Sequence, residues 1–295
     1  MGIYVADKDY YWMMDFTEKM IEHCAIAVNG TTKAKFGDQE IDFKAPYARI
    51  SMTEAIQKYT GFDITGKSEE ELYDFAKSIG IEVNETMGKG KLIDEIFGEK
   101  CEGNFIQPTF ITDYPVEMSP LTKKHRSQEG LTERFELMVC GKEIANAYSE
   151  LNDPIDQRAR FEDQLRLAEK GDDEAGQFID EDFLRALEYG MPPTSGMGIG
   201  MDRLIMFLTN NPSIQEVLFF PQMKPEKTVP QIELGEDEKV ILEILNSREE
   251  EFSLAEVKER SQLSGKKWDK ASKNLTKHNL VKVEKTGDNV LMKLV

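Results

Sequence analysis

The spacing of hydrophobic residues predicts a chain in which short strands and helices are mixed. After a strand-like start at residues 3–6, apolar side chains recur at the helical period along residues 10–28 and predict one long helix. Its expected inner side consists of Trp12, Met13, Phe16, Met20 and Cys24.

A small hairpin is expected over residues 32–43 and a strand over residues 108–114. Three short helices are expected between them, forming a helical insertion. Ser51 with Glu54 and Ser68 with Glu71 are capping boxes that mark the first two helices, and the third covers residues 91–101.

Residues 133–153 predict a β-hairpin in which polar residues stand where a plain strand would be apolar. Its strands cover residues 133–139 and 143–151, and Cys140-Gly141-Lys142 forms the turn. The period of two places an amide, a phenol and a carboxylate on one face: Asn146, Tyr148 and Glu150. Such a face is a poor core and a good pocket for a small ligand that carries both a carboxylate and a cation.

Two acidic residues stand on either side of this turn. Glu136 and Glu143 are close enough along the hairpin to share a divalent metal ion. Strand period puts Glu143 out of phase with Asn146, so it needs a bulge or a place in the turn. The alternatives are a solvated turn position for Glu143, a cross-strand partner role for Glu136, for example with Arg134, and ordinary strand packing for Tyr148.

A glycine-rich stretch, Gly196-Met197-Gly198-Ile199-Gly200, leads into a helix expected over residues 201–209. Glycines let a strand pass close to a ligand, and the positive end of the helix begins there. Arg203 in the first turn opposes the usual dipole preference and is suited to an anion such as a phosphate. The stretch is not a Walker loop, and tight strand–helix packing is the alternative explanation.

Helices are also expected at residues 154–170 and 181–189, and residues 224–233, with two prolines, are the best linker candidate. Beyond them, three helices and a terminal hairpin around Gly287-Asp288 predict a winged helix-turn-helix. Seven lysines and two acids lie between Gly265 and Lys285. Candidates for contact with RNA are Lys266, Lys267, Lys270 and Lys277. A packing module with a solvated lysine face is the alternative.

Composition narrows the function classes. The chain has 295 residues and a net charge of −18, so contact with nucleic acid needs a local basic patch. Three cysteines without metal spacing suggest a reducing compartment, and no signal peptide or long apolar run is seen, so a cytoplasmic protein without membrane contact is expected. None of the three histidines is expected near the hairpin, which argues against hydrolysis by a Ser-His-Asp triad.

The order of acidic hairpin, polar helix pair, glycine-rich strand and Arg-bearing helix resembles the class II aminoacyl-tRNA synthetases, and lysyl-tRNA synthetase more than its aspartyl or asparaginyl relatives. The resemblance covers about residues 3–225. It rests on Arg134-Phe135-Glu136, Gly141-Lys142-Glu143-Ile144, the segments 108–112, 146–153 and 196–203, and Leu218-Phe219-Phe220-Pro221. The implied fold is α+β: part of the class II antiparallel sheet flanked by helices, a helical insertion and a C-terminal winged-helix-like domain.

The resemblance implies a lysine–tRNA ligase, which activates lysine with ATP and transfers it to tRNA-Lys. Asn146 would bind the lysine carboxylate, Tyr148 would line the pocket, and Glu150 would pair with the ε-ammonium. Tyr4 sits where the family places a tyrosine near that ammonium.

For ATP, the resemblance implies a set of phosphate and metal contacts. Glu136 and Glu143 would hold Mg²⁺ that bridges the phosphates, and Arg203 would hold the γ-phosphate of a bent ATP. Gly198 and Gly200 would let the nucleotide lie close to the strand. The full-length family forms homodimers.

The chain departs from the family at its front, where the anticodon-binding domain, motif 1 and most of motif 2 have no counterpart. Gly2 stands where the family has an active-site glutamate. Residues 1–30 then correspond to the tail of motif 2 and the following helix. The remaining divisions are the insertion at 31–105, the C-terminal half of the catalytic core with motif 3 at 106–224, the linker at 225–234 and the extension at 235–295. We expect little or no aminoacylation by this chain alone.

Two other functions remain open. One is a lysyl transferase that acts on an elongation factor, which shares the pocket but typically lacks the insertion; residues 31–103 argue for the tRNA enzyme. The other is a non-catalytic RNA-binding remnant.

Overall fold

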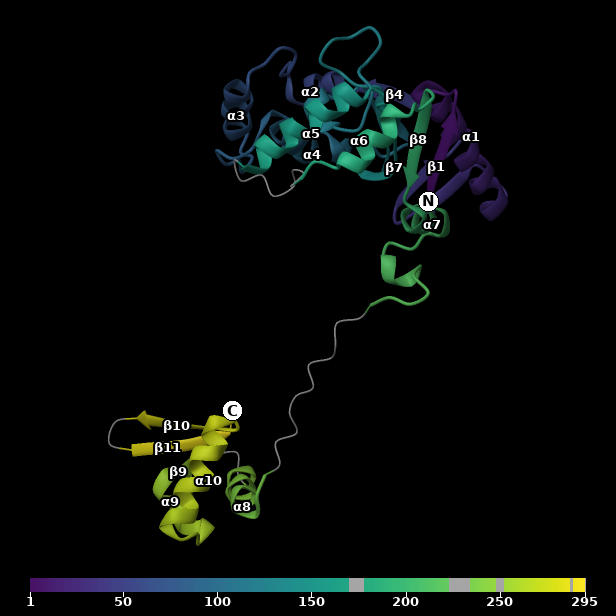
Figure 1. Ribbon diagram of the computed structural model, residues 1–295. Coiled ribbons are helices and arrows are strands. Elements are labelled where there is room, and N and C mark those ends of the chain that lie inside the picture. Colours follow the sequence, from purple (N-terminus) through teal and green to yellow (C-terminus); the bar gives the residue numbers. More distant parts are fainter. Residues whose placement is uncertain (170–177, 223–233, 248–251, 287–288, 295) are drawn as a thin grey trace. The chain divides into compact units, whose positions relative to one another are not determined.

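The computed structural model describes residues 1–169, 178–222, 234–247, 252–286 and 289–294. The chain divides into two compact units, Met1–Pro221 and Gln222–Val295. Each unit is described by itself (Figure 1).

The first unit is built on a six-stranded sheet of order β1-β8-β7-β6-β5-β4, antiparallel except for the pair β4 and β5. Its strands are β1 (Gly2–Ala6), β4 (Ala48–Ser51), β5 (Thr109–Thr112), β6 (Arg134–Val139), β7 (Lys142–Ser149) and β8 (Thr194–Ile199). The expected hairpin is β6–β7. Its turn consists of Cys140 and Gly141, both at positive φ, which is the backbone that matches the twist of a two-residue hairpin.

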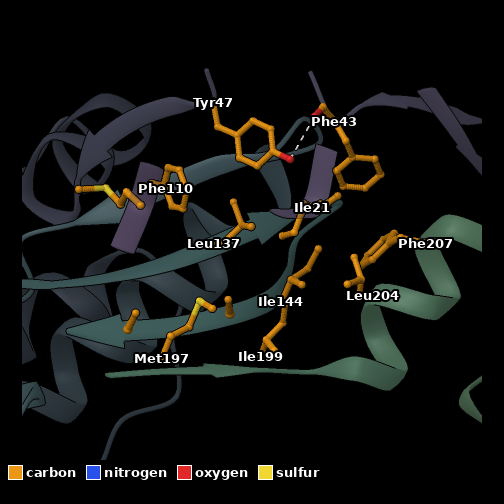
Figure 2. Close-up of a cluster of buried hydrophobic side chains, with 14 of the residues drawn as sticks. Ile21, Phe43, Tyr47, Phe110, Leu137, Ile144, Met197, Ile199, Leu204 and Phe207 are labelled. Carbon is orange, nitrogen blue, oxygen red and sulfur yellow. Dashed lines mark hydrogen bonds between the residues drawn. The ribbon is translucent and has the colours of Figure 1, made fainter. Parts of the chain in front are cut away.

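One face of this sheet is covered by α1 (Tyr10–Asn29) and α7 (Met201–Thr209). Figure 2 shows apolar side chains from these helices meeting those of the strands, among them Ile21, Leu204, Leu137 and Ile199. The expected inner side of α1 is partly wrong. The helix buries Met13, Met14, Thr17, Ile21 and Ala25, whereas Trp12, Phe16, Met20 and Cys24 are only partly buried at the rim of the core.

The insertion begins with the two-stranded sheet β2 (Lys33–Phe36) and β3 (Gln39–Asp42). Its helices are α2 (Met52–Thr60), α3 (Glu69–Ser78) and α4 (Lys89–Lys100). Both predicted capping boxes are confirmed, at Ser51 and at Ser68. The three helices share a separate core, which Ile111 and Met138 join to the sheet.

The remaining elements of the first unit are α5 (Pro154–Glu169), α6 (Glu181–Glu188) and three single turns of 3₁₀ helix: η1 (Glu102–Asn104), η2 (Val116–Met118) and η3 (Ile214–Glu216). Strand β4 was not expected. Its four residues carry no clear alternation, and the strand exists because β5 offers it a parallel partner.

The second unit contains the expected three helices and terminal hairpin. Its helices are α8 (Glu236–Asn246), α9 (Leu254–Ser261) and α10 (Gly265–Lys277), and a short extra strand extends the hairpin sheet to β10-β11-β9. These strands are β9 (Phe252–Ser253), β10 (Val281–Thr286) and β11 (Asn289–Leu294). The core includes Ile241, Val257, Trp268, Leu275 and Met292. Residues 225–233 of the expected linker and the hairpin tip at 287–288 lie outside the described residues.

Within the described part of the chain, no helix combines the length and the apolar character needed to cross a lipid bilayer.

Candidate functional site

The face of the sheet opposite α1 and α7 brings most of the predicted site residues into two rows. Because the strands are antiparallel and in register, residues far apart in sequence stand opposite one another. One row contains Tyr4, Gly196, Tyr148 and Arg134, and the next contains Gly2, Gly198, Asn146 and Glu136.

A β-bulge at Ile144 places Glu143 on this same face. The strand register pairs Leu137 with Ala145 and Met138 with Glu143, which leaves Ile144 as the extra residue. Ile144 itself is buried in the core, as Figure 2 shows. The bulge that the sequence required for Glu143 to join Asn146 is therefore confirmed.

The bulge also anchors Arg203. The main-chain N–H of Gly200 donates to the carbonyl of Ile144 at 2.8 Å, and Arg203 Nη1 donates to the carbonyl of Glu143 at 2.7 Å. The arginine in the first turn of α7 is thus tied to the strand that carries Glu143.

Glu150 lies above the glycine-rich strand with an unmet hydrogen-bonding need. Its Oε1 is buried and has no hydrogen-bond partner among the described residues. A Cβ on Gly196 would overlap this oxygen and would lie 2.8 Å from the Tyr4 ring, so only glycine leaves room for both. Burial raises the pKa of the Glu150 carboxyl to about 7. Burial, and then the neighbouring Glu150, raise the pKa of Tyr148 to about 12.

Arg134 organises the centre of this face, a role that the sequence pattern did not reveal. Its guanidinium is mostly buried, pairs with Glu136 at 2.6 Å and donates to Asn146 Oδ1 at 3.2 Å. It also donates to the Met118 carbonyl and lies 4.4 Å from the centre of the Tyr114 ring. The partner role for Glu136 that the sequence allowed is therefore present.

Two further carboxylates reach this region from the insertion side, and no sequence pattern pointed to them. Burial, and then Glu136, raise the pKa of both Glu143 and Glu102. Burial also raises the pKa of Asp94, with Glu136 as a further acidic neighbour. Uncompensated negative charge therefore gathers around Glu136 and Glu143, despite Arg134 and Arg203.

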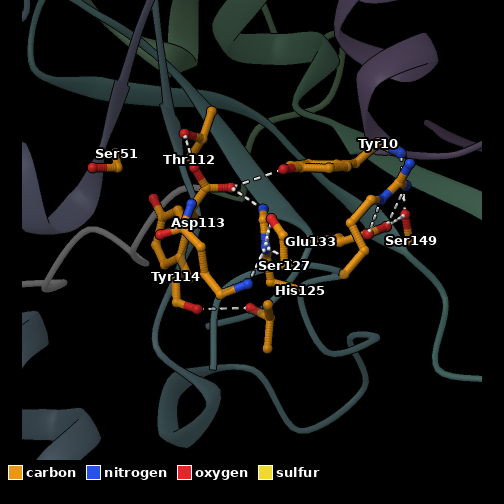
Figure 3. Close-up of polar contacts among 12 residues, drawn as sticks. Tyr10, Ser51, Thr112, Asp113, Tyr114, His125, Ser127, Glu133 and Ser149 are labelled. Atoms are coloured by element: carbon orange, nitrogen blue, oxygen red, sulfur yellow. Dashed lines mark hydrogen bonds and ion pairs between the residues drawn. The ribbon is translucent and has the colours of Figure 1, made fainter. Parts of the chain in front are cut away.

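A second polar network fixes the ends of the same strands (Figure 3). Glu133, which is buried, accepts from Arg126 at 2.6 Å and from Ser149 Oγ at 2.6 Å. Ser149 Oγ in turn accepts the main-chain N–H of Tyr10 at the start of α1. Because Glu133 precedes Arg134 and Ser149 precedes Glu150, this network holds two site residues in position.

His125 lies nearer to this region than its place in the sequence suggested. Its Nε2 is 3.7 Å from Asp113 Oδ1, and its Nδ1 is 3.4 Å from Ser127 Oγ (Figure 3). However, Nδ1 accepts the main-chain N–H groups of Ser127 and Gln128, at 3.2 and 3.0 Å. The imidazole therefore closes a turn, and its Nδ1 is not available as a base for the serine hydroxyl.

The hollows in the first unit overlap the site face only in part. A hollow of about 640 Å³ lies between the insertion and residues 113–131, and none of the predicted site residues lines it. Smaller hollows of about 320 and 280 Å³ are bordered by Arg134 and by Glu150, respectively.

The Glu133 network makes a testable prediction about stability. Burial opposes ionisation of Glu133, but Arg126 and Ser149 outweigh it and lower its pKa in the folded chain. The contribution of this group is therefore present above pH 4.5 and is lost as the pH falls through the folded pKa. We expect Arg126→Met to lower the free energy of unfolding by about 2 kcal/mol at pH 7, and by much less at pH 3.5.

Urea unfolding followed through Trp12 fluorescence, in a Trp268→Phe background, would measure this cost. Arg158→Met is the matched control, because its pair with Glu181 is exposed on both sides and is worth at most about 0.5 kcal/mol. A loss that is equal in both variants, or independent of pH, would contradict the role given to Glu133.

Comparisons with known proteins agree with this geometry. The family described as tRNA synthetases class II (D, K and N) matches residues 1–224. A lysine–tRNA ligase of Christiangramia forsetii is 70% identical over 294 residues, which are 100% of this chain and 51% of that protein. One of Porphyromonas gingivalis is 71% identical over 230 residues, 78% of this chain and 40% of that protein. One of Azobacteroides pseudotrichonymphae is 64% identical over 225 residues, 76% of this chain and 45% of that protein. The chain thus spans about half the length, or less, of these curated relatives.

Proposed function

Since the chain belongs to the class II tRNA synthetases (D, K and N), we propose that it carries the lysine- and ATP-binding face of a lysine–tRNA ligase. This enzyme would join lysine to ATP as lysyl-adenylate and pass the lysyl group to tRNA-Lys, as a cytoplasmic homodimer. The observation that carries the proposal is the buried, unpartnered oxygen of Glu150 above Gly196.

Glu150 is suited to select the ε-ammonium of lysine. A buried carboxylate without a partner keeps a raised pKa, and a cation supplied by the ligand removes the cause of that rise. The rings of Tyr4 and Tyr148 lie beside Glu150 and would flank the aliphatic stem of lysine. Asn146, two residues before Tyr148 on the same face, would bind the lysine carboxylate. An amino acid whose side chain has the same shape as lysine but no charge would leave Glu150 unpaired. The pocket would therefore select lysine over such an amino acid.

The donor set beside the turn fits Mg²⁺ together with ATP. Within the described residues, no group of three His, Cys, Asp or Glu side chains is placed to hold a metal ion. Two carboxylates, Glu136 and Glu143, suit an ion that takes its other ligands from phosphates and water. The raised pKa of Glu143 supports this assignment, since a bound cation would favour its ionised form. When bound, Mg²⁺ would neutralise phosphate charge.

The other ATP contacts follow from the same strands. Arg203, held by the Glu143 carbonyl, would direct its guanidinium to the γ-phosphate. Gly198 and Gly200 keep the strand free of side chains where the nucleotide would lie.

The activation of lysine by ATP depends on the positioning of the two substrates more than on proton transfer by the protein. The lysine carboxylate is ionised at neutral pH, so its oxygen can form the bond to the α-phosphorus while the bond to pyrophosphate breaks. A hydroxyl of tRNA then attacks the acyl carbon and AMP leaves. The side chains of this face would bind, orient and neutralise, and none is required as a base for the first step.

We expect Glu150→Gln to weaken lysine binding by at least about 100-fold, because the amide cannot pair with the ammonium. Isothermal titration of the 295-residue chain at pH 8 would measure it. Norleucine, which lacks the ammonium, is the control ligand and should bind weakly to both forms. Equal lysine affinity in the two forms would refute the role of Glu150.

Gly196→Ala tests the space above the strand. Its Cβ would displace Glu150 and the Tyr4 ring, so lysine affinity should fall about tenfold or more. Gly198→Ala is the control on the same face of the same strand, because its Cβ meets only the Asn146 carbonyl, at 3.9 Å. In titrations without ATP it should retain lysine affinity within about threefold, and an equal loss in both variants would contradict the assignment of the pocket.

A further inference from the structure

The outward face of α10 carries four lysines in one line. Lys266, Lys270, Lys273 and Lys277 are spaced by four, three and four residues, the spacing that keeps side chains on one side of a helix. All four are exposed. The opposite side of the helix buries Trp268, Ala271 and Leu275 in the core of the second unit. We call the four residues the lysine stripe.

No ion pair neutralises the lysine stripe within the described part of its unit. Among the described residues, none of its four members has an ion pair, whereas other lysines of the unit do. Lys239 pairs with Glu236, and Lys282 and Lys293 both pair with Glu284. The pairs with Lys282 and Lys293 lower the pKa of Glu284 to about 2.

The stripe differs in one member from the four lysines selected from the sequence. Lys267 is turned by roughly 100° from the line and pairs with Asp237 at 3.6 Å. Lys273, which was not selected, completes the line instead. Asp269, three residues after Lys266 and four before Lys273, is the one acidic residue of α10 and borders the line.

The place of α10 in the fold makes this face suited to a ligand. Helix α9, a short turn and α10 form the helix-turn-helix, with α10 as its second helix, and the left-handed backbone of Gln262 ends α9. Residues 235–295 hold twelve Lys or Arg and twelve Asp or Glu, so their formal charges balance and the stripe is a local concentration of positive charge. The acidic residues include Glu236, Asp237 and Glu238 in the first turn of α8.

We propose that the lysine stripe binds the phosphate backbone of folded RNA. Its four ammonium groups extend over roughly 16 Å, or about one per 5 Å, a spacing suited to successive phosphates along a strand. Lysines act as point charges on phosphates, and the line contains no arginine, asparagine or glutamine for reading base edges. The deep major groove of A-form RNA excludes a helix, so α10 lies along the backbone and the contact is independent of sequence. The choice of RNA over DNA rests on the proposed function.

The experiment uses the whole 295-residue chain and fluorescence anisotropy with three probes: a tRNA-Lys transcript, an unrelated RNA duplex and a DNA duplex of the same sequence. In the test variant, Lys266, Lys270, Lys273 and Lys277 are all changed to Gln. In the control variant, the same change is made at Lys239, Lys258, Lys282 and Lys293. A third variant, with Arg at all four stripe positions, keeps the charge.

We expect the test variant to bind both RNAs about tenfold or more weakly at 100 mM KCl. The slope of log K against log salt should fall by about three, because four phosphate contacts are lost. The control and the Arg variant should stay within about threefold of the unchanged chain, and the DNA duplex should bind less tightly than the RNA.

Equal losses in the test and control variants, an unchanged salt slope, or tighter binding of the DNA duplex would overturn the proposal. Circular dichroism of each variant separates these outcomes from misfolding. The lysine titration of the first unit is an independent readout. If the unchanged chain binds RNA through the stripe but does not bind lysine, the ligase proposal alone is refuted. If the unchanged chain binds lysine but not RNA, the lysine stripe alone is refuted.

Discussion

The arrangement of the site face depends on one buried carboxylate that has no partner among the described residues. Glu150 Oε1 is kept from water and from any hydrogen-bond donor of the described residues, so its pKa is raised to about 7. Such a group costs stability unless a ligand supplies the missing cation. The glycine beneath it, the two tyrosines beside it and the Glu133 network behind it all serve to keep this oxygen in place and accessible to a ligand.

The metal and phosphate region depends on a different local feature, the extra residue Ile144. Without this bulge, Glu143 would face the core and Arg203 would lose the carbonyl that holds it. With it, the hairpin β6–β7, which is apolar toward α1, presents Glu136, Glu143 and Asn146 on its other face. The cost is mutual repulsion among Glu136, Glu143 and their acidic neighbours, which a bound cation would relieve.

Local patterns predicted the elements that depend on local chemistry. The two capping boxes, the hairpin turn at Gly141 and the glycine-rich strand were all found as expected, and the resemblance to class II synthetases was confirmed. Features that depend on distant partners were missed. Strand β4 needs β5, the buried side of α1 is set by the sheet, and Arg134 and Asp94 meet only in the folded chain. The ion pair of Lys267 was also missed, because its acidic partner lies on another helix.

The central claim is that Glu150 is protonated without ligand near neutral pH and ionises to receive the lysine ammonium. Isothermal titration with lysine at pH 6.5, in buffers of different ionisation enthalpy, measures the protons released on binding. With a pKa of about 7 in the free chain, the account predicts release of ~0.8 proton per lysine at pH 6.5 and ~0.1 at pH 8. No release at pH 6.5, or the same release from Glu150→Gln, would contradict it.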